Sequence, residues 1–250
     1  MQACDPLAVV GFERHSIIFD DPQLRLQRTD ERMSRIYFGS REEAAKTGRI
    51  VHAMHRRVKG KTPEEYGPIP KGTPYAASDP ELGLWVLATL ADSAVVYYER
   101  IFGSLASDER ERYWREYRQV GELLGLPSDS MPATYPELKE YIDGRLGDGS
   151  LWISDDRREQ AERMILDPPW SGWARTAAIP LTETIRLIST GLLPPAIRRL
   201  FGFGWDPARE ALLRSTLLQL RVGARFWPDA VRLHPAARLP AGERYGTLAA

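Results

Sequence analysis

Apolar and polar positions follow the period of an α-helix along most of the chain. After Asp79, apolar or small side chains fall at steps of three and four and form one stripe: Leu82, Trp85, Val86, Thr89, Leu90 and Ser93. Asp79 is a favourable N-cap, and Pro80 suits the first helical position. The spacing predicts a helix that begins after Asp79 and turns this stripe towards the core.

Similar boundary residues predict helices in the rest of the chain. Ser107 opens a segment with acidic residues in its first turn and Gly125 as its stop. Further helices are expected over residues 136–145, 154–164, 180–190 and 207–226. Because the period-two alternation of a strand never persists beyond a few positions, we predict an all-α fold. No linker or repeat divides the sequence, so we expect one globular helical domain over residues 1–250.

Composition narrows the classes of function. Hydrophobic residues make up 43% of the chain and charged residues 27%, as is usual for a globular protein. Lys plus Arg and Asp plus Glu both number 34, so the net charge favours neither nucleic acid nor an anionic membrane as a partner. Cys4 is the only cysteine, which excludes an internal disulfide and a cysteine-based zinc site.

The sequence also gives an expectation for location. No window approaches the roughly 18 uninterrupted apolar residues that a membrane span needs. The amino-terminal stretch lacks the basic and apolar regions of a signal peptide. We therefore expect a cytoplasmic protein with no membrane span. No heptad seam predicts an oligomeric state.

Two of the four histidines are candidates for chemistry. His52 and His55 lie three residues apart on one predicted helix, so their side chains share a face. Neutral imidazole is a common ligand for iron, copper and zinc. The alternative, which the spacing alone favours, is a solvated basic face, because Arg56 and Arg57 follow directly.

A second cluster combines two arginines with a hydroxyl. Arg25, Arg28 and Thr29 share a face if the segment after Asp21-Pro22 is helical. Guanidinium and hydroxyl groups on one face suit a carboxylate, a propionate or a bound oxygen species. An ordinary surface helix with local ion pairs is the alternative, and without further information it is favoured.

Several short sequence motifs in a fixed order favour the chemical interpretation of both clusters over the surface alternatives. They are Arg-x-x-x-Thr at 25–29, YFG at 37–39, HRRVKG at 55–60 and YAASDPELGLWVLATLADS at 75–93. GLPSDSMPATYPEL and LLPPAIRRLFGFGWDP follow in the carboxy-terminal half. Their order and spacing resemble the rubber-oxygenase (latex-clearing) and mycophenolate-pathway oxygenase family, from about residue 8 to residue 240.

The resemblance implies a helical bundle that binds haem b. In the family pattern, an Arg-x-x-x-Thr helix lies over the haem, which corresponds to Arg25 and Thr29 here. The histidine before the Val-x-Gly pair is the axial iron ligand, which corresponds to His55. Arg28 and His52 are further candidates for contacts with bound oxygen or the propionates. Trp85 is a candidate for the wall of the cofactor pocket, with a plain core position as the alternative.

Three positions depart from the family pattern. Arg28 stands where latex-clearing enzymes have a lysine that can occupy the second axial position, and arginine is a poor iron ligand. His52 replaces an arginine, and Leu87 stands where a histidine often follows the Trp-Val pair. The chain also lacks the extra helices of the rubber enzymes, so we do not expect rubber to be the substrate.

The resemblance therefore predicts a haem-dependent oxygenase or oxidative tailoring enzyme. It would act with dioxygen on a small apolar metabolite, such as a prenyl, terpenoid, polyketide or aromatic compound. One alternative is a non-catalytic protein that binds haem or another small ligand. Another is a helical interaction protein without a cofactor, in which the His-Arg helix is only a solvated face.

Overall fold

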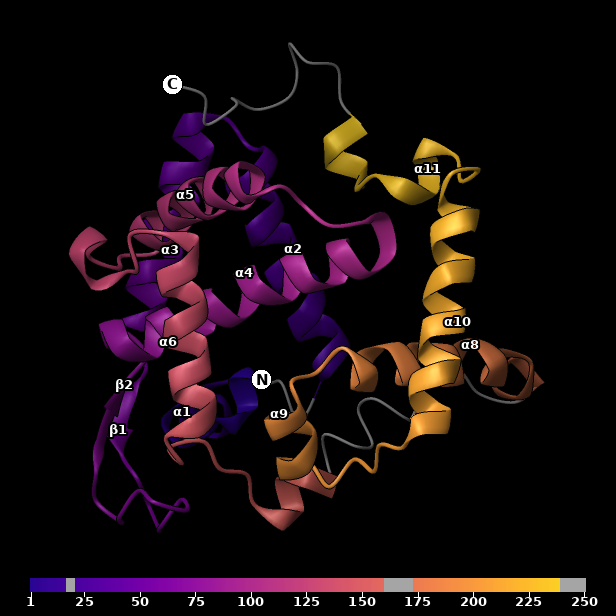
Figure 1. The fold of residues 1–250 in the computed structure, drawn as a ribbon. Helices are drawn as coiled ribbons and strands as arrows, with labels where there is room; N and C mark the ends of the chain where they lie inside the picture. The colour runs from indigo at the N-terminus through magenta and orange to yellow at the C-terminus, as the bar shows by residue number, and fades with distance from the viewer. Residues whose placement is uncertain (17–20, 160–172, 239–250) are drawn as a thin grey trace.

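The long helix α4 (Pro80–Phe102) runs through the middle of the molecule (Figure 1). The computed structural model describes residues 1–16, 21–159 and 173–238, and this part of the chain is mostly helical. Helix α4 packs against α5 (Ser107–Leu123), α6 (Tyr135–Gly147), α10 (Pro207–Ala224) and two short 3-10 helices, η1 (Gln2–Cys4) and η2 (Ser128–Ser130). The predicted start after Asp79 is confirmed. The expected core-facing stripe is only partly correct: Trp85 and Thr89 are buried, but Leu90 and Ser93 are exposed. The buried face is instead completed by Leu84, Leu87, Ala88 and Ala91.

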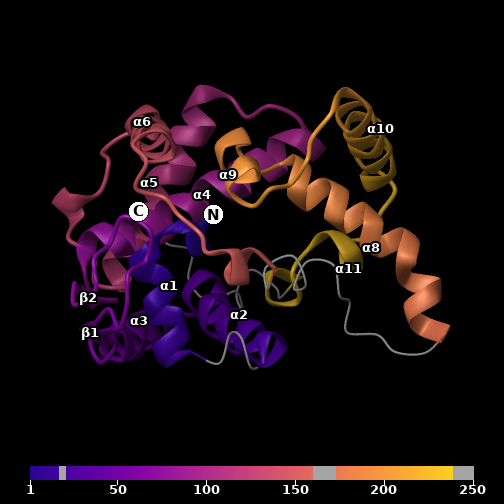
Figure 2. The same cartoon turned by 90° about the horizontal axis from the view of Figure 1, so that it is seen from below.

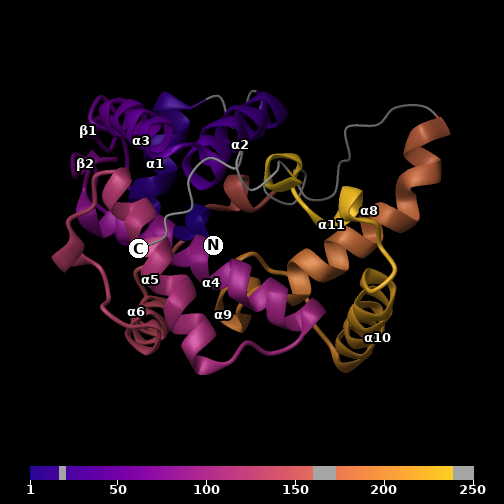
Figure 3. The same ribbon diagram turned by 90° about the horizontal axis from the view of Figure 1, so that it is seen from above.

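The other elements are arranged around this helix. Three helices precede it: α1 (Pro6–His15), α2 (Pro22–Phe38) and α3 (Arg41–His55). In the carboxy-terminal part are α8 (Trp173–Gly191), α9 (Pro195–Leu200), α11 (Asp229–Arg232) and the 3-10 helix η3 (Pro235–Arg238). Figures 2 and 3 place α8 and α10 on the side of the molecule away from α1 and α3.

A recurring Asp-Pro pair explains where four of the helices begin. Proline is tolerated at the first helical position, and the aspartate before it accepts a hydrogen bond from a free backbone N–H of the first turn. This arrangement is present at Asp5, Asp21, Asp79 and Asp206. Helix boundaries in this chain are therefore set largely by local side chains.

One part of the core is built from α4, α5 and α6. Trp114 of α5 and Leu138 and Ile142 of α6 are fully buried against α4. The Trp114 indole N–H donates to the Pro132 carbonyl over 3.0 Å, so its one polar atom is satisfied. At the end of α5, Gly125 adopts a positive φ of 95°, which confirms it as the predicted helix stop.

The structure corrects several of the predicted boundaries and adds a small sheet. Strands β1 (Lys59–Lys61) and β2 (Pro74–Ala76) form a small antiparallel sheet, so the fold is mostly helical rather than entirely so. Helix α8 begins at Trp173 and contains Pro180, where we expected the start. Helix α6 extends to Gly147. The expected helix over 154–164 lies partly outside the described residues.

The carboxy-terminal segment returns to the amino-terminal half of the chain. Helices α8 and α10 pack on one another, and η3 reaches α2. His234 stacks on Phe38 of α2 with a ring-centroid distance of 5.3 Å, and its Nε2 lies 3.6 Å from Asp30 Oδ1. In the described part of the chain, no helix combines the length and the apolarity that crossing a bilayer requires.

Candidate functional site

Helices α2 and α3 form a hairpin that brings distant residues together. Ser40 opens α3 with a capping box: its hydroxyl accepts from the Glu43 N–H, and the Glu43 carboxylate accepts from the Ser40 N–H. The short connection through Gly39 makes α3 run back along α2. The first turn of α2 and the last turn of α3 therefore lie at the same end, which places Arg25 near His55.

His55 is the last residue of α3 and is half-buried. Within the described residues, its imidazole makes no hydrogen bond to protein. Burial lowers the pKa of His55 below its ordinary value, and the nearby His52 and the Arg25 guanidinium lower it further. The neutral ring, with a free lone pair, is thus the favoured form at neutral pH.

Arg25 and Thr29 of α2 are joined by two hydrogen bonds. The Arg25 Nη1 donates to Thr29 Oγ1 over 2.7 Å, and the Thr29 hydroxyl donates to the Arg25 carbonyl over 2.9 Å. Burial lowers the pKa of the Arg25 guanidinium, with a further contribution from Arg32. A guanidinium has five N–H donors, so most of its donors remain available to an anion.

The other two polar candidates have different surroundings. Arg28 is exposed, and within the described residues its side chain has no ion pair. The His52 Nδ1–H donates to the Leu124 carbonyl over 3.1 Å, and the His52 ring lies directly against Gly125. The structure therefore brings His55, Arg25 and Thr29 together, leaves Arg28 outside this group and ties His52 to the end of α5.

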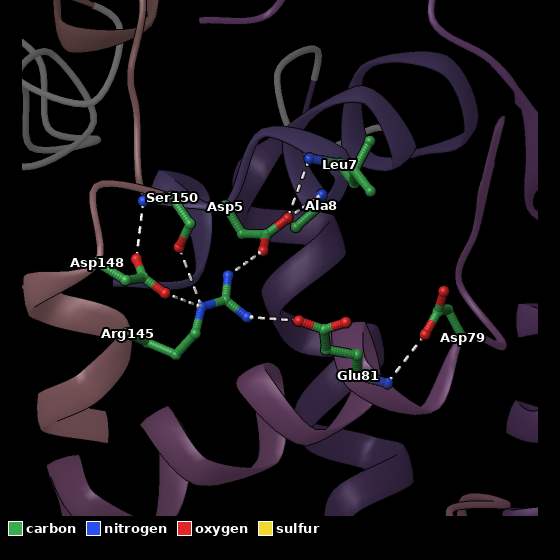
Figure 4. A network of polar contacts seen from close by, with 8 residues as sticks. All are labelled: Asp5, Leu7, Ala8, Asp79, Glu81, Arg145, Asp148 and Ser150. Atoms are coloured by element: carbon green, nitrogen blue, oxygen red, sulfur yellow. Dashed lines mark hydrogen bonds and ion pairs between the residues drawn. The ribbon is translucent and has the colours of Figure 1, made fainter. Parts of the chain in front are cut away.

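Trp85 lies in a separate part of the core. Its neighbours are Cys4, Ile197 and Phe201, none of which belongs to α2 or α3. The Arg145 guanidinium covers its ring at 5.1 Å. Figure 4 shows how this guanidinium is held by Asp5 and Ser150, with Glu81 and Asp148 farther away. The Trp85 indole Nε1 has no hydrogen-bond partner in the described structure.

The single candidate ligand, His55, suits a metal cofactor that supplies its other donor atoms itself. Across the described ranges, no three His, Cys, Asp or Glu side chains gather where they could hold a metal ion. A single imidazole is too small a set for a metal held by protein alone. It is sufficient for haem, because the porphyrin supplies four nitrogens and the protein adds an axial histidine. The half-buried Arg25 guanidinium beside it suits a carboxylate such as a propionate. The residues present fit haem.

Sequence reasoning missed two contacts of this region. His234 packs on α2, and the His52 ring contacts the turn after α5. Both contacts join residues far apart in the chain, and no local pattern signals such partners.

The fold and the site together define a class: a mostly helical protein with one neutral, half-buried histidine beside a half-buried arginine. Comparison with known proteins names the family. The model for the catalytic domain of "ER-bound oxygenase mpaB/B'/Rubber oxygenase" matches residues 1–222, and the chain belongs to this family. The resemblance in the sequence motifs is thereby confirmed.

The similar curated proteins come from mycobacteria. Uncharacterized proteins of Mycobacterium tuberculosis and Mycobacterium bovis are each 25% identical over 213 residues, which cover 84% of this chain and 78% of the relative. No solved structure matches. The family name indicates an oxygenase, and these relatives add no substrate.

Proposed function

We propose that this chain is a haem b-dependent oxygenase with His55 as the axial iron ligand. The observation that carries the proposal is the His55 imidazole, which is half-buried, free of hydrogen bonds within the described structure and kept neutral by its surroundings. Membership of an oxygenase family makes iron the expected partner of such a ring. The cofactor would supply dioxygen activation and the redox chemistry.

The residues around His55 have roles that follow from their contacts. The Arg25 guanidinium keeps most of its N–H donors and would pair with a propionate. The proton of the Thr29 hydroxyl is already donated to the Arg25 carbonyl. Thr29 therefore acts by orienting Arg25 rather than by donating to the reacting molecule. His52 holds the end of α3 in place through Leu124.

Membership of the family supports oxygenation as the reaction class. An oxygenase of this family would combine dioxygen with a small apolar metabolite, such as a prenyl, terpenoid, polyketide or aromatic compound. Fold and family membership do not determine which compound is used.

The absorption spectrum tests the iron ligand. Wild-type protein produced with a haem precursor is expected to be red, with a Soret band at about one haem per chain. H55G should lose the band while its helical circular dichroism is retained. Added imidazole should restore the band in H55G, because the small molecule fills the space left by the side chain and offers the same nitrogen.

His15 provides a matched control, since it lies at the end of α1 and bonds the Tyr75 hydroxyl. H15A should keep the Soret band. Loss of the band in H52A but not in H55G would move the ligand one helical turn and overturn the assignment. A colourless wild-type preparation would reject the haem proposal altogether.

A second candidate is a haem binder without turnover. Two observations favour it: Arg28 is exposed, and the Thr29 hydroxyl already donates its proton to the Arg25 carbonyl. Neither side chain would then donate a hydrogen bond to bound oxygen. Oxygen-electrode measurements on the reduced holoprotein separate the two functions. An oxygenase consumes oxygen in proportion to added apolar substrate, whereas a binder shows the spectrum and no substrate-dependent consumption.

A further inference from the structure

Helix α10 is apolar on both of its faces. Its inner face buries Leu213, Leu217 and Ala224 against the rest of the protein. Its outer face carries four large apolar side chains, Leu212, Leu218, Val222 and, just beyond the helix, Phe226. Small or uncharged polar residues lie between them (Ala211, Ser215 and Gln219), and the exposed Arg214 lies at its border. Leu218 and Phe226 are 61% and 81% exposed, far more than a side chain packed against protein. Contiguous exposed apolar surface marks an interaction site.

Figures 1, 2 and 3 all place α10 at the periphery of the molecule. Its outer face is therefore accessible to a large flat partner as well as to a small one. Aromatic side chains lie at the carboxy-terminal end of this surface. Phe226 and Trp227 follow the last turn of α10, and Phe102 of α4 lies beside that turn.

Arginines line one edge of this face. Arg221 donates to the carbonyls of Ile101 and Glu99 and so caps the end of α4. Arg225 has no acceptor among the described residues and is exposed. Together with Phe102, both arginines line a pocket of about 270 Å³ between the ends of α4 and α10. A pocket with guanidinium and apolar walls suits the head and upper chain of an acidic amphiphile.

Charge distribution supports an anionic partner. The segment 173–238 contains ten arginines and only four acidic residues, although the whole chain is neutral. The one acidic residue of α10, Glu210, is already bonded to the Trp205 indole and to Arg214. In a symmetric dimer through this face, the arginines of the two α10 helices would therefore meet without a free carboxylate from either helix.

We propose that the outer face of α10 and the Arg221–Arg225 pocket dock this protein on an anionic lipid bilayer. The helix would lie in the interface, with Leu218, Val222 and Phe226 inserted and Arg225 at the level of the phosphates. An anionic cytoplasmic leaflet fits the cytoplasmic location expected from the sequence. Such docking gives direct access to apolar molecules dissolved in the membrane, and it does not depend on the haem proposal.

Vesicle co-sedimentation tests the docking. Full-length protein is mixed with vesicles of phosphatidylcholine alone or with about a third phosphatidylglycerol. Wild type should bind the anionic vesicles at least tenfold more strongly than the neutral ones, and high salt should weaken the binding. L218E/V222E should lose binding, and R225E should bind about tenfold more weakly because one cationic contact becomes repulsive.

Two control variants make the same chemical changes elsewhere. I50E places a carboxylate on an exposed apolar position of α3, and R112E reverses an exposed arginine of α5. Both should bind as wild type does. Absence of binding to anionic vesicles overturns the proposal, as does equal loss in I50E and L218E/V222E. Light scattering provides a third check, since a wild-type dimer that V222E dissociates would assign the face to a second copy instead.

Discussion

At the scale of single residues, the protonation state of His55 follows from its surroundings. Burial removes water that would stabilise the imidazolium, and two neighbouring groups, His52 and the Arg25 guanidinium, repel its charge. The pKa in the folded protein is therefore lower than that in the unfolded chain, near 6.5. Because the unfolded state then binds more protons, His55 lowers the stability as pH falls below that unfolded value.

Substitution of Arg25 tests this electrostatic coupling directly. In haem-free R25Q, the pKa of His55 should rise towards its ordinary value, because one positive neighbour is removed while burial remains. NMR titration of the histidine ring protons measures the change. R35Q alters an exposed arginine at the other end of α2 and should leave the His55 titration where it is in wild type. An unchanged midpoint in R25Q would show that the guanidinium does not act on this ring.

The loss of Arg145 should cost far more stability than the loss of a surface arginine. Its side chain is 12% exposed, and it pairs over 2.8 Å with Asp5, whose side chain is 9% exposed (Figure 4). It also covers the Trp85 ring. R145M would leave the Asp5 carboxylate buried without its partner, which should lower the free energy of unfolding by about 3 kcal/mol.

Urea denaturation compares R145M with a surface pair. Arg186 lies 3.9 Å from Glu183, and both side chains are well exposed. R186M should therefore cost less than about 1 kcal/mol. Similar losses for the two variants would mean that the Arg145 network contributes no more than a surface ion pair.

At the scale of elements, the end of α5 and the position of α3 depend on one glycine. Gly125 has a φ of 95°, which disfavours any L side chain by about 1–2 kcal/mol. A methyl group there would also overlap the His52 ring that bonds Leu124. G125A should therefore destabilise the protein by about 3 kcal/mol, the strain plus the cost of overpacking.

Gly72 separates the two contributions, because its φ is 85° and no atom would lie within 4 Å of an added Cβ. G72A should cost only the strain, about 1–2 kcal/mol. The difference between the two variants in urea denaturation measures the contact with His52. If G125A costs no more than G72A, His52 is free to move and does not fix α3.

Local signals made several elements predictable. Asp-Pro pairs carry both an N-cap and a first-turn residue, so the starts of α4 and α10 could be located from the sequence. Strands β1 and β2 could not, because each is three residues long and β1 is exposed throughout. We expected α8 to begin at Pro180, whereas it begins at Trp173 and passes through this proline, although proline usually breaks a helix.

The site was only partly predictable for a related reason. Spacing alone placed His52 and His55 on one face but favoured a solvated surface. The family motifs selected His55 and Arg25, which are thirty residues apart, and the α2–α3 hairpin explains why they meet. His52 differs from His55 because its ring is hydrogen-bonded to the Leu124 carbonyl. Leu124 is seventy-two residues from His52 in the chain, and no pattern in the sequence indicates that contact.

At the scale of the whole molecule, a neutral total charge conceals a basic carboxy-terminal part. The total charge alone does not favour an anionic membrane as a partner, yet ten of the arginines fall within residues 173–238. The candidate haem ligand lies on α3, and the proposed lipid-facing surface lies on α10, which the three views place on different sides. Cofactor binding and membrane docking would therefore be carried by separate parts of the fold.

The carboxy-terminal segment, which follows α10, contacts the helix that carries Arg25 and Thr29, because η3 packs on α2. The His234 ring stacks on Phe38, and its Nε2 lies near Asp30, one residue after Thr29. F38A removes the stacking surface, so residues 229–238 should exchange their amide hydrogens faster in hydrogen–deuterium exchange. Y98A removes a different aromatic pair, with Phe102, and should leave that segment unchanged. Because α2 carries Arg25 and Thr29, a loosened η3 in F38A should also speed exchange in the first turns of α2. Exchange unchanged in both segments would mean that the carboxy-terminal segment adds nothing to the stability of the helix that bears the candidate site.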